Sequence, residues 1–553
     1  MSSDSNATLR IGSRRSDLAR LQTLMVADRL EEMGYKVECE YQEAPGDTNL
    51  KDPLWKMPET GVFTTFLRQK LLDGSVDLVV HSWKDLPLAE EAGTTVAATL
   101  PRADPRDLII IRKDAEAEIR AMNGKLIVLS SSPRRQWNLP AFLQRAVPGV
   151  ETVEFRDVRG NIQTRMRKLM DPARHDASLG PRPHALVLAK AAVDRFAQSH
   201  RGEFRNSREL VQGYLSKCHC MVLPLSANPT AAAQGALGVE VSTASEKGHV
   251  RKIVSKLNDE QTFQAAWREK EVLGAYGGGC HQRIGCTVLP RWYGKVGHLR
   301  GRTDGGVDLL RSEIIPTNAI DDSLRVDPGE HPLKVGGAGG LSLFTREEDT
   351  TAGERLLEAL RGAGDGVGLW IAKSTALPNA PADLVEDINA MNIPVWVAGI
   401  PSWQHLAQRG LWCVGCTDGL GEIEDPDLKK SIAPSLRKWI KLTHTKAAEE
   451  QGNGHFDTAP DCEVEQLGTY TLVSKYEPRS CPEQLKSATY IFWGSGSAFT
   501  EARRLLPDLL DKVLVHGTGP GHTLETLLAA GVPRERIIVC LNYDEFERRI
   551  HRD

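Results

Sequence analysis

The sequence has no stretch that could cross a membrane as a helix. None of its 553 residues lie in a run approaching the roughly 18 apolar residues of a membrane span. The N-terminal MSSDSNATLR also lacks the apolar segment of a secretory signal. We therefore expect a cytoplasmic protein that does not use the membrane as a partner.

A strong excess of one charge is also missing. The chain carries 69 Lys and Arg against 73 Asp and Glu, a formal net charge of −4. Such a balance provides no global field that would favour nucleic acid, so any anion site must come from local basic clusters. With 41% hydrophobic and 26% charged residues, the composition is typical of a soluble protein of several domains.

The ten cysteines do not form the framework of a metal site or of disulfides. Cys218 and Cys220 lie in KCHC, and Cys413 and Cys416 lie in a distant WCVGC. A structural zinc site usually draws its ligands from two such pairs at matched spacing. We expect no metal and reduced thiols, with packing as the role of both pairs and a metal as the alternative.

Short apolar runs alternate with amphipathic stretches along most of the chain. TLRIGS precedes a helical pattern that ends at Gly34, and VDLVVHSW, KLIVLSSS and HALVLAK repeat the rhythm. A second series begins near residue 340 with strands such as GVGLWIAKS and ATYIFWGSGS, while 446–466 is predicted to be an exposed loop. This alternation predicts an α/β fold with mostly parallel sheets, which bind ligands at the carboxyl ends of their strands.

Basic and hydroxyl residues follow the predicted strands of the N-terminal half. Arginine binds carboxylates through a planar fork, so several arginines in one cleft predict a ligand with many carboxylates or phosphates. A solvated charged face is the alternative. Asp85 either accepts hydrogen bonds from ligand N–H groups or pairs with a neighbouring cation. The residues are Arg14, Ser16, Ser82, Lys84, Asp85, Ser130, Ser132, Arg134, Arg135, Arg159, Arg165 and Arg195.

The segment YGGGCHQRIG places Cys280 on a backbone almost without side chains. The residues alone leave several roles open for this thiol: nucleophile, metal ligand, redox thiol, covalent anchor or apolar filler. His281 next to it raises the possibility of an activated thiol pair.

Residues 8 to about 290 resemble the porphobilinogen deaminase (hydroxymethylbilane synthase) family. The matching motifs are LRIGSRRSDLA, GDTNLKDPL, VDLVVHSWKDLP, ADPRD, SSSPRRQ, RGNIQTR, AAAQGALGVE and GGGCHQRIG, in family order. The resemblance implies that Cys280 anchors one covalent dipyrromethane cofactor per chain. Four porphobilinogen molecules would then be joined with loss of ammonia, and water would release hydroxymethylbilane.

The resemblance also assigns roles to the strand-end residues. Asp85 would be the catalytic carboxylate. Cofactor-binding residues would be Ser82, Lys84, Ser130, Ser132, Arg134 and Arg135, and substrate-binding residues would be Arg14, Ser16, Arg159, Arg165 and Arg195. The partners would be porphobilinogen and linear tetrapyrroles of heme biosynthesis, bound by a monomer. The sequence departs from the family pattern at Thr60, Thr65, Lys270, Leu129 and Pro133.

The family fold has three domains, of which two are α/β domains like those of periplasmic binding proteins and one is a small α+β domain. We expect the first over 1–104 with a return segment at about 215–245. The second would cover 105–214, and the third 246–340 with the cofactor cysteine.

Residues 341–553 resemble uroporphyrinogen-III synthase, a bilobal α/β module. The motifs are LFTREED, VWVAGIPSWQHLAQRGL, ATYIFWGSGSAF and VLVHGTGPGHTLETLLAAGV. Ser495, Ser497 and Thr523 would bind substrate carboxylates at helix N-termini. The usual tyrosine falls on Val473, with Tyr470 close by.

Three functions remain open from the sequence. The first is a bifunctional deaminase and uroporphyrinogen-III synthase. The second is a deaminase with a degenerate C-terminal domain, and the third is a two-domain anion-binding protein without chemistry.

Overall fold

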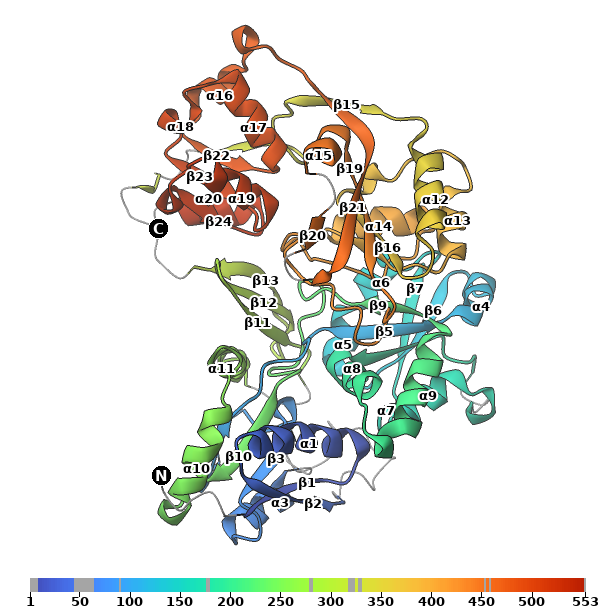
Figure 1. Cartoon of the computed structure of the whole chain (residues 1–553), viewed down its shortest axis with the longest axis vertical. Coiled ribbons are helices and arrows are strands. Elements are labelled where there is room, and N and C mark those ends of the chain that lie inside the picture. Colours follow the sequence, from blue (N-terminus) through green and yellow to red (C-terminus); the bar gives the residue numbers. More distant parts are fainter. Residues whose placement is uncertain are drawn as a thin grey trace.

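The computed structural model describes residues 8–43, 64–88, 91–175, 180–277, 282–316, 324–326, 331–451, 454–456 and 459–551. The described residues form five β-sheets, spread along the long axis of the molecule from the N-terminal sheet to the C-terminal one (Figure 1). We call residues 8–316 the N-terminal half and residues 331–551 the C-terminal half. None of the described helices is both long enough and apolar enough to span a membrane.

The first sheet contains five strands in the order β2-β1-β3-β10-β4. β1 is parallel to β2 and β3, whereas β10 returns from far along the chain and pairs antiparallel with β3 and β4. Ser16 caps the first helix by accepting a hydrogen bond from Ala19 N. The strands are β1 (Thr8–Arg14), β2 (Lys36–Gln42), β3 (Leu78–Ser82), β4 (Thr94–Ala98) and β10 (Leu237–Ser242), with helices α1 (Asp17–Glu32), α3 (Thr65–Leu72) and α10 (Gly248–Val254).

The second sheet has the order β7-β6-β8-β5-β9. Its central strands are almost completely buried, because helices cover the sheet, and they are correspondingly apolar. The strands are β5 (Asp107–Arg112), β6 (Lys125–Leu129), β7 (Thr152–Arg156), β8 (Ala185–Ala189) and β9 (Cys218–Val222). The helices are α4 (Glu116–Ala121), α5 (Pro133–Asn138), α6 (Pro140–Ala146), α7 (Ile162–Met170), α8 (Lys190–Gln198) and α9 (Arg205–Leu215).

These sheets confirm the predicted alternation of strands and helices but change one boundary. The return segment was predicted at about 215–245. β9 instead pairs with β5 in the second sheet, so only the chain after it returns to the first sheet. The chain therefore crosses between the two sheets at 99–106 and again at 223–236.

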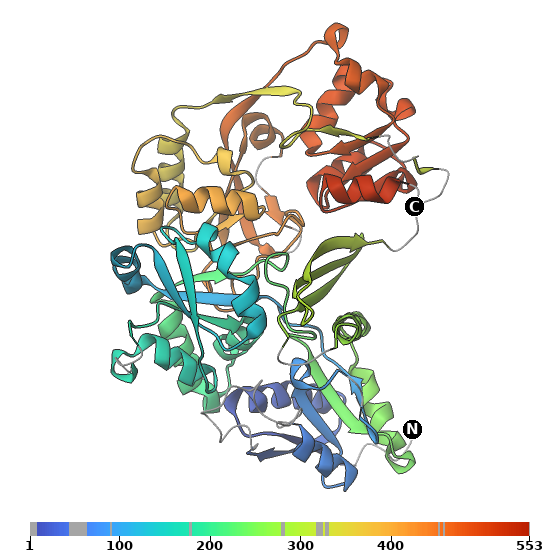
Figure 2. The same cartoon turned by 180° about the vertical axis from the view of Figure 1, so that it is seen from behind.

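A third sheet, β11-β12-β13, lies between the first sheet and the last part of the chain (Figure 2). Helix α11 (Glu260–Gly274) packs on its first strand. The strands are β11 (Gly285–Arg291), β12 (Gly294–Arg302) and β13 (Asp308–Ile315).

The C-terminal half has two lobes, each built on its own sheet. The first lobe has the order β15-β21-β19-β16-β17-β18, with β20 beside β21. Its strands are β15 (Phe344–Glu348), β16 (Val367–Ile371), β17 (Val395–Val397), β18 (Gly415–Cys416), β19 (Lys438–His444), β20 (Gly454–Phe456) and β21 (Ala459–Ser474). Its helices are α12 (Ala352–Ala363), α13 (Leu384–Ala390), α14 (Ile400–Gln408) and α15 (Thr445–Gln451).

The second lobe has the order β14-β22-β23-β24. Its strands are β14 (Leu333–Val335), β22 (Tyr490–Trp493), β23 (Val515–Thr518) and β24 (Ile537–Val539). Its helices are α16 (Glu483–Ser487), α17 (Gly496–Leu505), α18 (Leu509–Lys512), α19 (His522–Ala529) and α20 (Tyr543–Ile550).

Two predictions for this half are wrong. The boundary was predicted at 340, but β14 pairs with β22 and therefore belongs to the second lobe. The segment 446–466 was predicted to be a loop, yet it contains α15, β20 and the start of the long strand β21. Because the start of β21 pairs with β19 on one side and β20 on the other, tertiary pairing overrides its polar sequence.

The first C-terminal lobe packs directly on the second sheet of the N-terminal half. The Trp403 ring meets Phe142 edge-on at 5.2 Å between centroids, and its indole N–H donates to Ala146 O at 3.0 Å. Val222 N donates to Val414 O at 2.7 Å, joining the edge of one half to the other. The two halves thus share one hydrophobic core.

Candidate active site

Asp85 stands where the first sheet meets the second. It ends the short turn Trp83–Asp85 that follows β3. Trp83 is buried against Phe263 and Trp267, which holds the turn, while Asp85 is exposed. Burial lowers the pKa of both Lys84 and Arg165, and the Asp85 charge opposes this shift in each, so its carboxylate lies within electrostatic reach of both cations.

Lys84 is held by hydrogen bonding and surrounded by charge. Its ammonium donates to Gln234 Oε1 at 3.3 Å. Burial lowers the pKa of Lys84 to about 8, and the charges of Arg135 and Arg134 add to this shift. A cation with a lowered pKa favours binding an anion, because a bound carboxylate would stabilise its charged form.

Asp107 lies at the centre of the cations and was not predicted as a site residue. Its carboxylate accepts from Arg135 Nε at 2.9 Å and Nη2 at 2.6 Å, and from Arg134 Nη2 at 3.0 Å. Gln234 donates to it at 2.9 Å. Burial alone raises the pKa of Asp107, but the charges of Arg135 and Arg134 reverse this effect and hold it far below its ordinary value.

Arg134 and Arg135 are therefore oriented by the protein itself. Besides Asp107, Arg134 donates to Pro229 O at 2.7 Å and Arg135 donates to Val187 O at 3.2 Å. Both side chains are almost fully buried. The prediction treated them as direct carboxylate ligands, whereas the structure places them first of all in an internal ion pair. This ion pair could have been predicted from the aspartate at the start of the apolar strand RDLIII. A carboxylate that is buried with such a strand needs charged or hydrogen-bonding partners.

Arg165 and Arg195 complete a group of cations that we call the cationic wall. Its members are Lys84, Arg134, Arg135, Arg165 and Arg195. Burial lowers the pKa of both Arg165 and Arg195 to about 10. For Arg165, the charges of Arg135 and Arg159 add to the effect. Arg195 Nη2 donates to Gly235 O at 2.8 Å, whereas its buried Nε has no hydrogen-bond partner among the described residues. A buried donor without a partner points to a ligand acceptor.

The predicted hydroxyl residues lie at the same strand ends but already make protein hydrogen bonds. Ser16 caps α1, and Ser82 donates to Gln22 Oε1 at 3.0 Å. Ser130 Oγ accepts from Ser132 N at 3.4 Å. Arg14 ends β1 nearby.

Cys280 and His281 lie outside the described residues, but the two ends of their loop are described. Gln282 Nε2 donates to Tyr276 O at 2.5 Å, which closes the base of the loop. A Cβ on Gly285 would lie 2.1 Å from Pro229 O and 2.9 Å from Arg134 Cδ. The loop therefore ends against the cationic wall, and only glycine allows this approach.

Lys270, which departs from the family pattern, has a structural role here. It is buried and donates to Leu86 O at 2.9 Å and Pro87 O at 3.1 Å, directly after Asp85. Thr60 lies outside the described residues, and Thr65 begins α3.

A family model described as porphobilinogen deaminase, dipyromethane cofactor binding domain, matches residues 9–249. The porphobilinogen deaminase of Acidothermus cellulolyticus is 35% identical over 282 residues, which make up 50% of this chain and 74% of that protein. The chain belongs to the porphobilinogen deaminase family. The family member from Syntrophomonas wolfei is 33% identical over 295 residues, covering 53% of this chain and 84% of its own. The predicted family and its dipyrromethane cofactor are thereby confirmed for the N-terminal half.

The C-terminal half lies beyond the residues that the family model matches. Among solved structures, the methionine binding protein MetQ aligns with 48% of this chain and 95% of its own at 10% identity. The TM-score of 0.24 is too low to support a conclusion about fold.

A second polar site lies between the two C-terminal lobes. His444, at the end of β19, is 3.2 Å through Nε2 from Ser497 Oγ in α17. Ala447 N donates to His444 Nδ1, so the neutral ring carries its proton on Nε2 and donates it to the serine. Ser495 caps α17 by accepting from Ala498 N at 3.2 Å, and Thr523 is half-buried in α19.

Two cations accompany this contact on the side of the first lobe. The Arg346 guanidinium lies 4.2 Å from the centroid of the Tyr470 ring, which is 6.1 Å from the His444 ring. Burial and the Arg346 charge lower the pKa of Lys373. Arg346, Lys373 and His444 were not predicted from the sequence, because they lie in or just after three different strands and resemble ordinary surface residues there.

The two cysteine pairs are buried thiols. Burial raises the pKa of Cys218 to about 12 and that of Cys416 well above its ordinary value. Among the described residues, no three His, Cys, Asp or Glu side chains gather closely enough to hold a metal ion.

Proposed function

We propose that this chain is a hydroxymethylbilane synthase that joins four porphobilinogen molecules head to tail and releases ammonia at each step. Family membership supports the reaction class. The observation that carries the proposal is the position of Asp85, an exposed carboxylate within the field of Lys84 and Arg165. Lys84 is joined through Gln234 to Asp107, which holds two further arginines.

The residues present fit a dipyrromethane cofactor. This group carries several carboxylates, and the wall offers Lys84, Arg165 and the unpartnered Nε of Arg195 to receive them. When bound through Cys280, the cofactor supplies the primer to which the pyrroles are joined. A growing tetrapyrrole adds negative charge at every step, so a wall of buried cations with lowered pKa values is a suitable host.

Asp85 has two tasks in this proposal. It accepts hydrogen bonds from pyrrole N–H groups, which orients the substrate. As ammonia leaves, positive charge develops on the pyrrole, and the ionised carboxylate stabilises it.

Intact mass of the protein purified from cells tests the proposal. Wild type should be heavier than its sequence by two linked pyrrole units, and Cys280→Ser should not. Asp85→Asn should keep the heavier mass if it receives preformed hydroxymethylbilane, but turn over porphobilinogen at least about a hundredfold more slowly. An unmodified wild type that binds phosphate and leaves porphobilinogen unchanged would instead support an anion-binding protein.

The C-terminal half is proposed to be a uroporphyrinogen-III synthase that closes the linear product with inversion of its last ring. The supporting observation is the set of Arg346, Lys373 and His444 with Ser497 at the meeting of the two lobes. This set suits a ligand with several carboxylates. Fusion to the deaminase would shorten the time in which free hydroxymethylbilane closes to the wrong isomer.

The isomer composition of the product tests this second activity. Purified protein given porphobilinogen should produce the type III isomer, and Arg346→Gln should shift the product towards type I. Arg361→Gln is the matched control, because Arg361 pairs with Asp387 on the surface of the same lobe. Type I product alone from wild type would mean that the C-terminal half is degenerate and the chain is a deaminase only.

A further inference from the structure

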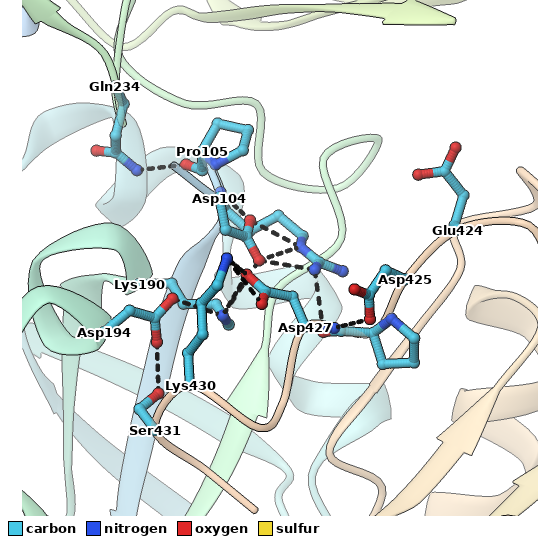
Figure 3. A network of polar contacts seen from close by, with 12 residues as sticks. Asp104, Pro105, Lys190, Asp194, Gln234, Glu424, Asp425, Asp427, Lys430 and Ser431 are labelled. Atoms are coloured by element: carbon cyan, nitrogen blue, oxygen red, sulfur yellow. Dashed lines mark hydrogen bonds and ion pairs between the residues drawn. The ribbon is translucent and has the colours of Figure 1, made fainter. Parts of the chain in front are cut away.

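The segment 417–431 joins β18 to β19 in the first C-terminal lobe, yet much of its surface lies against the N-terminal half. We call it the 417–431 loop. Figure 3 shows its polar contacts with residues near the crossing between the first and second sheets. Its sequence, TDGLGEIEDPDLKKS, carries five carboxylates, which could pass for a solvated acidic stretch.

The loop first holds the start of helix α8. Lys190 is completely buried, and its ammonium lies 3.2 Å from Asp427 of the loop, 2.7 Å from Asp194 and 3.4 Å from Asp104 (Figure 3). Ser431 Oγ donates to Asp194 at 2.5 Å. Two residues of the loop therefore complete the partner set of a buried charged pair on α8.

The loop also holds the start of strand β5. Arg106 Nη2 donates to Pro426 O at 3.2 Å and pairs with Asp104 at 2.7 Å. The Arg106 guanidinium lies 5.6 Å from the centroid of the Trp396 ring in the C-terminal half. Lys190 N donates to Arg106 O at 3.0 Å, so the two anchored elements are joined to each other.

Further contacts hold the second crossing and the strand after the Cys280 loop. Asp418 accepts from Ser226 N at 2.8 Å in the segment 223–236. Glu424 binds the Arg291 guanidinium through both oxygens, at 2.5 and 2.6 Å, at the end of β11. The loop thus contacts both crossings and the third sheet.

Two of the anchored residues, Asp194 and Arg106, are next in sequence to residues that form or hold the cationic wall. Asp194 binds the loop through Ser431, and Arg195 donates to Gly235 O while its buried Nε has no partner among the described residues. Arg106 faces the loop, and Asp107 holds Arg134 and Arg135. A displacement of Asp194 or Arg106 would therefore move the cations that we expect to bind substrate.

We propose that Asp427 and Ser431, which belong to the C-terminal half, are positioning residues for the deaminase reaction. They set the place of Arg195 through α8. The proposal rests on the proposed deaminase function and adds that the deaminase cleft is completed from the other half of the chain. Losing Asp427 would leave Lys190 with two of its three carboxylates, and α8 would shift to recover a partner or water.

The test uses the full-length protein with Asp427→Asn, Ser431→Ala and Asp427→Glu. Asp427→Asn should raise the KM for porphobilinogen by roughly two- to thirtyfold, the range of effects seen for residues that act through others. The kcat should change less, because Arg195 binds substrate carboxylates without taking part in the bond changes. Ser431→Ala should raise the KM by a smaller factor. Asp427→Glu should have a KM close to that of wild type.

Asp387→Asn is the matched control, since it removes an aspartate of the same lobe whose ion pair, with Arg361, lies within that lobe. Hydrogen exchange of α8 gives a second reading, with faster exchange expected in Asp427→Asn and not in the control. A folded Asp427→Asn protein with wild-type KM and unchanged α8 exchange would overturn the proposal. The proposal would also be overturned if Asp427→Asn and Asp427→Glu lost activity equally and in proportion to their loss of thermal stability.

The two proposals fail in different ways. A wild-type protein that does not consume porphobilinogen would overturn the deaminase function and, with it, the kinetic role of Asp427. Hydrogen exchange of α8 would then still decide whether the 417–431 loop positions this helix. A positive turnover with no effect of Asp427 would overturn only the further inference.

Discussion

The two candidate sites of this chain hold their cations in different ways. In the N-terminal half, Arg134 and Arg135 are buried and share Asp107, which is fully buried as well. In the C-terminal half, Arg346 is half-buried, lies on the face of the Tyr470 ring and donates to Thr375 O. The first arrangement orients each guanidinium through a buried opposite charge, whereas the second uses a neutral ring and a carbonyl oxygen. Removal of the holding group should therefore be more costly in the N-terminal half than in the C-terminal half.

The largest expected effect comes from removing the buried counterion. Asp107→Asn should destabilise the second sheet by about 3–5 kcal/mol, because two buried guanidinium groups lose their charged partner. Turnover of porphobilinogen should be lost with it. By contrast, Tyr470→Leu should destabilise the first C-terminal lobe by only about 0.5–1 kcal/mol through loss of the cation–π contact with Arg346. The lost packing of the ring adds to this.

Urea unfolding followed by hydrogen exchange, read separately in β5 and β21, measures both changes. If Asp107→Asn leaves β5 as stable as in wild type, the buried counterion does not hold its arginines more firmly than the Tyr470 ring holds Arg346, and the comparison of the two sites is wrong.

The pH dependence of stability should separate the first sheet from the last lobe. Hydrogen bonds from His81 and Thr94 lower the pKa of buried Glu240 to about 2, although burial alone would raise it. Burial lowers the pKa of His516 to about 4, with Arg536 adding to the effect. Each group is more acidic in the folded protein, so the unfolded form binds the proton first and stability falls as pH decreases.

The two windows differ. The last lobe should lose up to about 3 kcal/mol between pH 6.5 and about 4, where His516 titrates, and the first sheet should lose a similar amount between pH 4.5 and about 2. Hydrogen exchange of β23 and β10 across this range measures each window. His516→Gln retains an acceptor for the Trp493 indole and should abolish the loss of stability between pH 6.5 and about 4. Glu240→Gln should abolish the loss between pH 4.5 and about 2. Simultaneous loss of protection in both strands would contradict the assignment.

A smaller expected effect concerns the pH dependence of cofactor acquisition. Each candidate site contains one lysine with a lowered pKa, Lys84 in the first and Lys373 in the second. Apo-protein made without porphobilinogen should acquire its cofactor more slowly above pH 8, because Lys84 then loses the proton that attracts carboxylates. Lys84→Arg keeps its charge and should flatten this decline. Intact mass against time at several pH values measures the rate. A decline that is unchanged in Lys84→Arg would assign the titration to another group, and Lys373→Arg serves as the control in the other site.

Several features could be predicted from the sequence because they depend on local order. The alternation of apolar strands and amphipathic helices predicted the α/β fold, since a period of two or of 3.6 residues is set by neighbours in the chain. The strand-end rule predicted that Asp85, Lys84, Arg165 and Arg195 lie at one edge, and the structure places Asp85 within electrostatic reach of Lys84 and Arg165. The motif order was sufficient to predict the family.

The sequence determined which side chains stand at the ends of strands and what chemistry they can offer. Only the tertiary structure decided their partners. Asp107 receives two arginines from 27 and 28 positions away, and Lys190 receives Asp427 from 237 positions away. The physical reason is that a buried charge must be neutralised by whichever opposite charge the fold brings near, and no local pattern encodes a partner so distant.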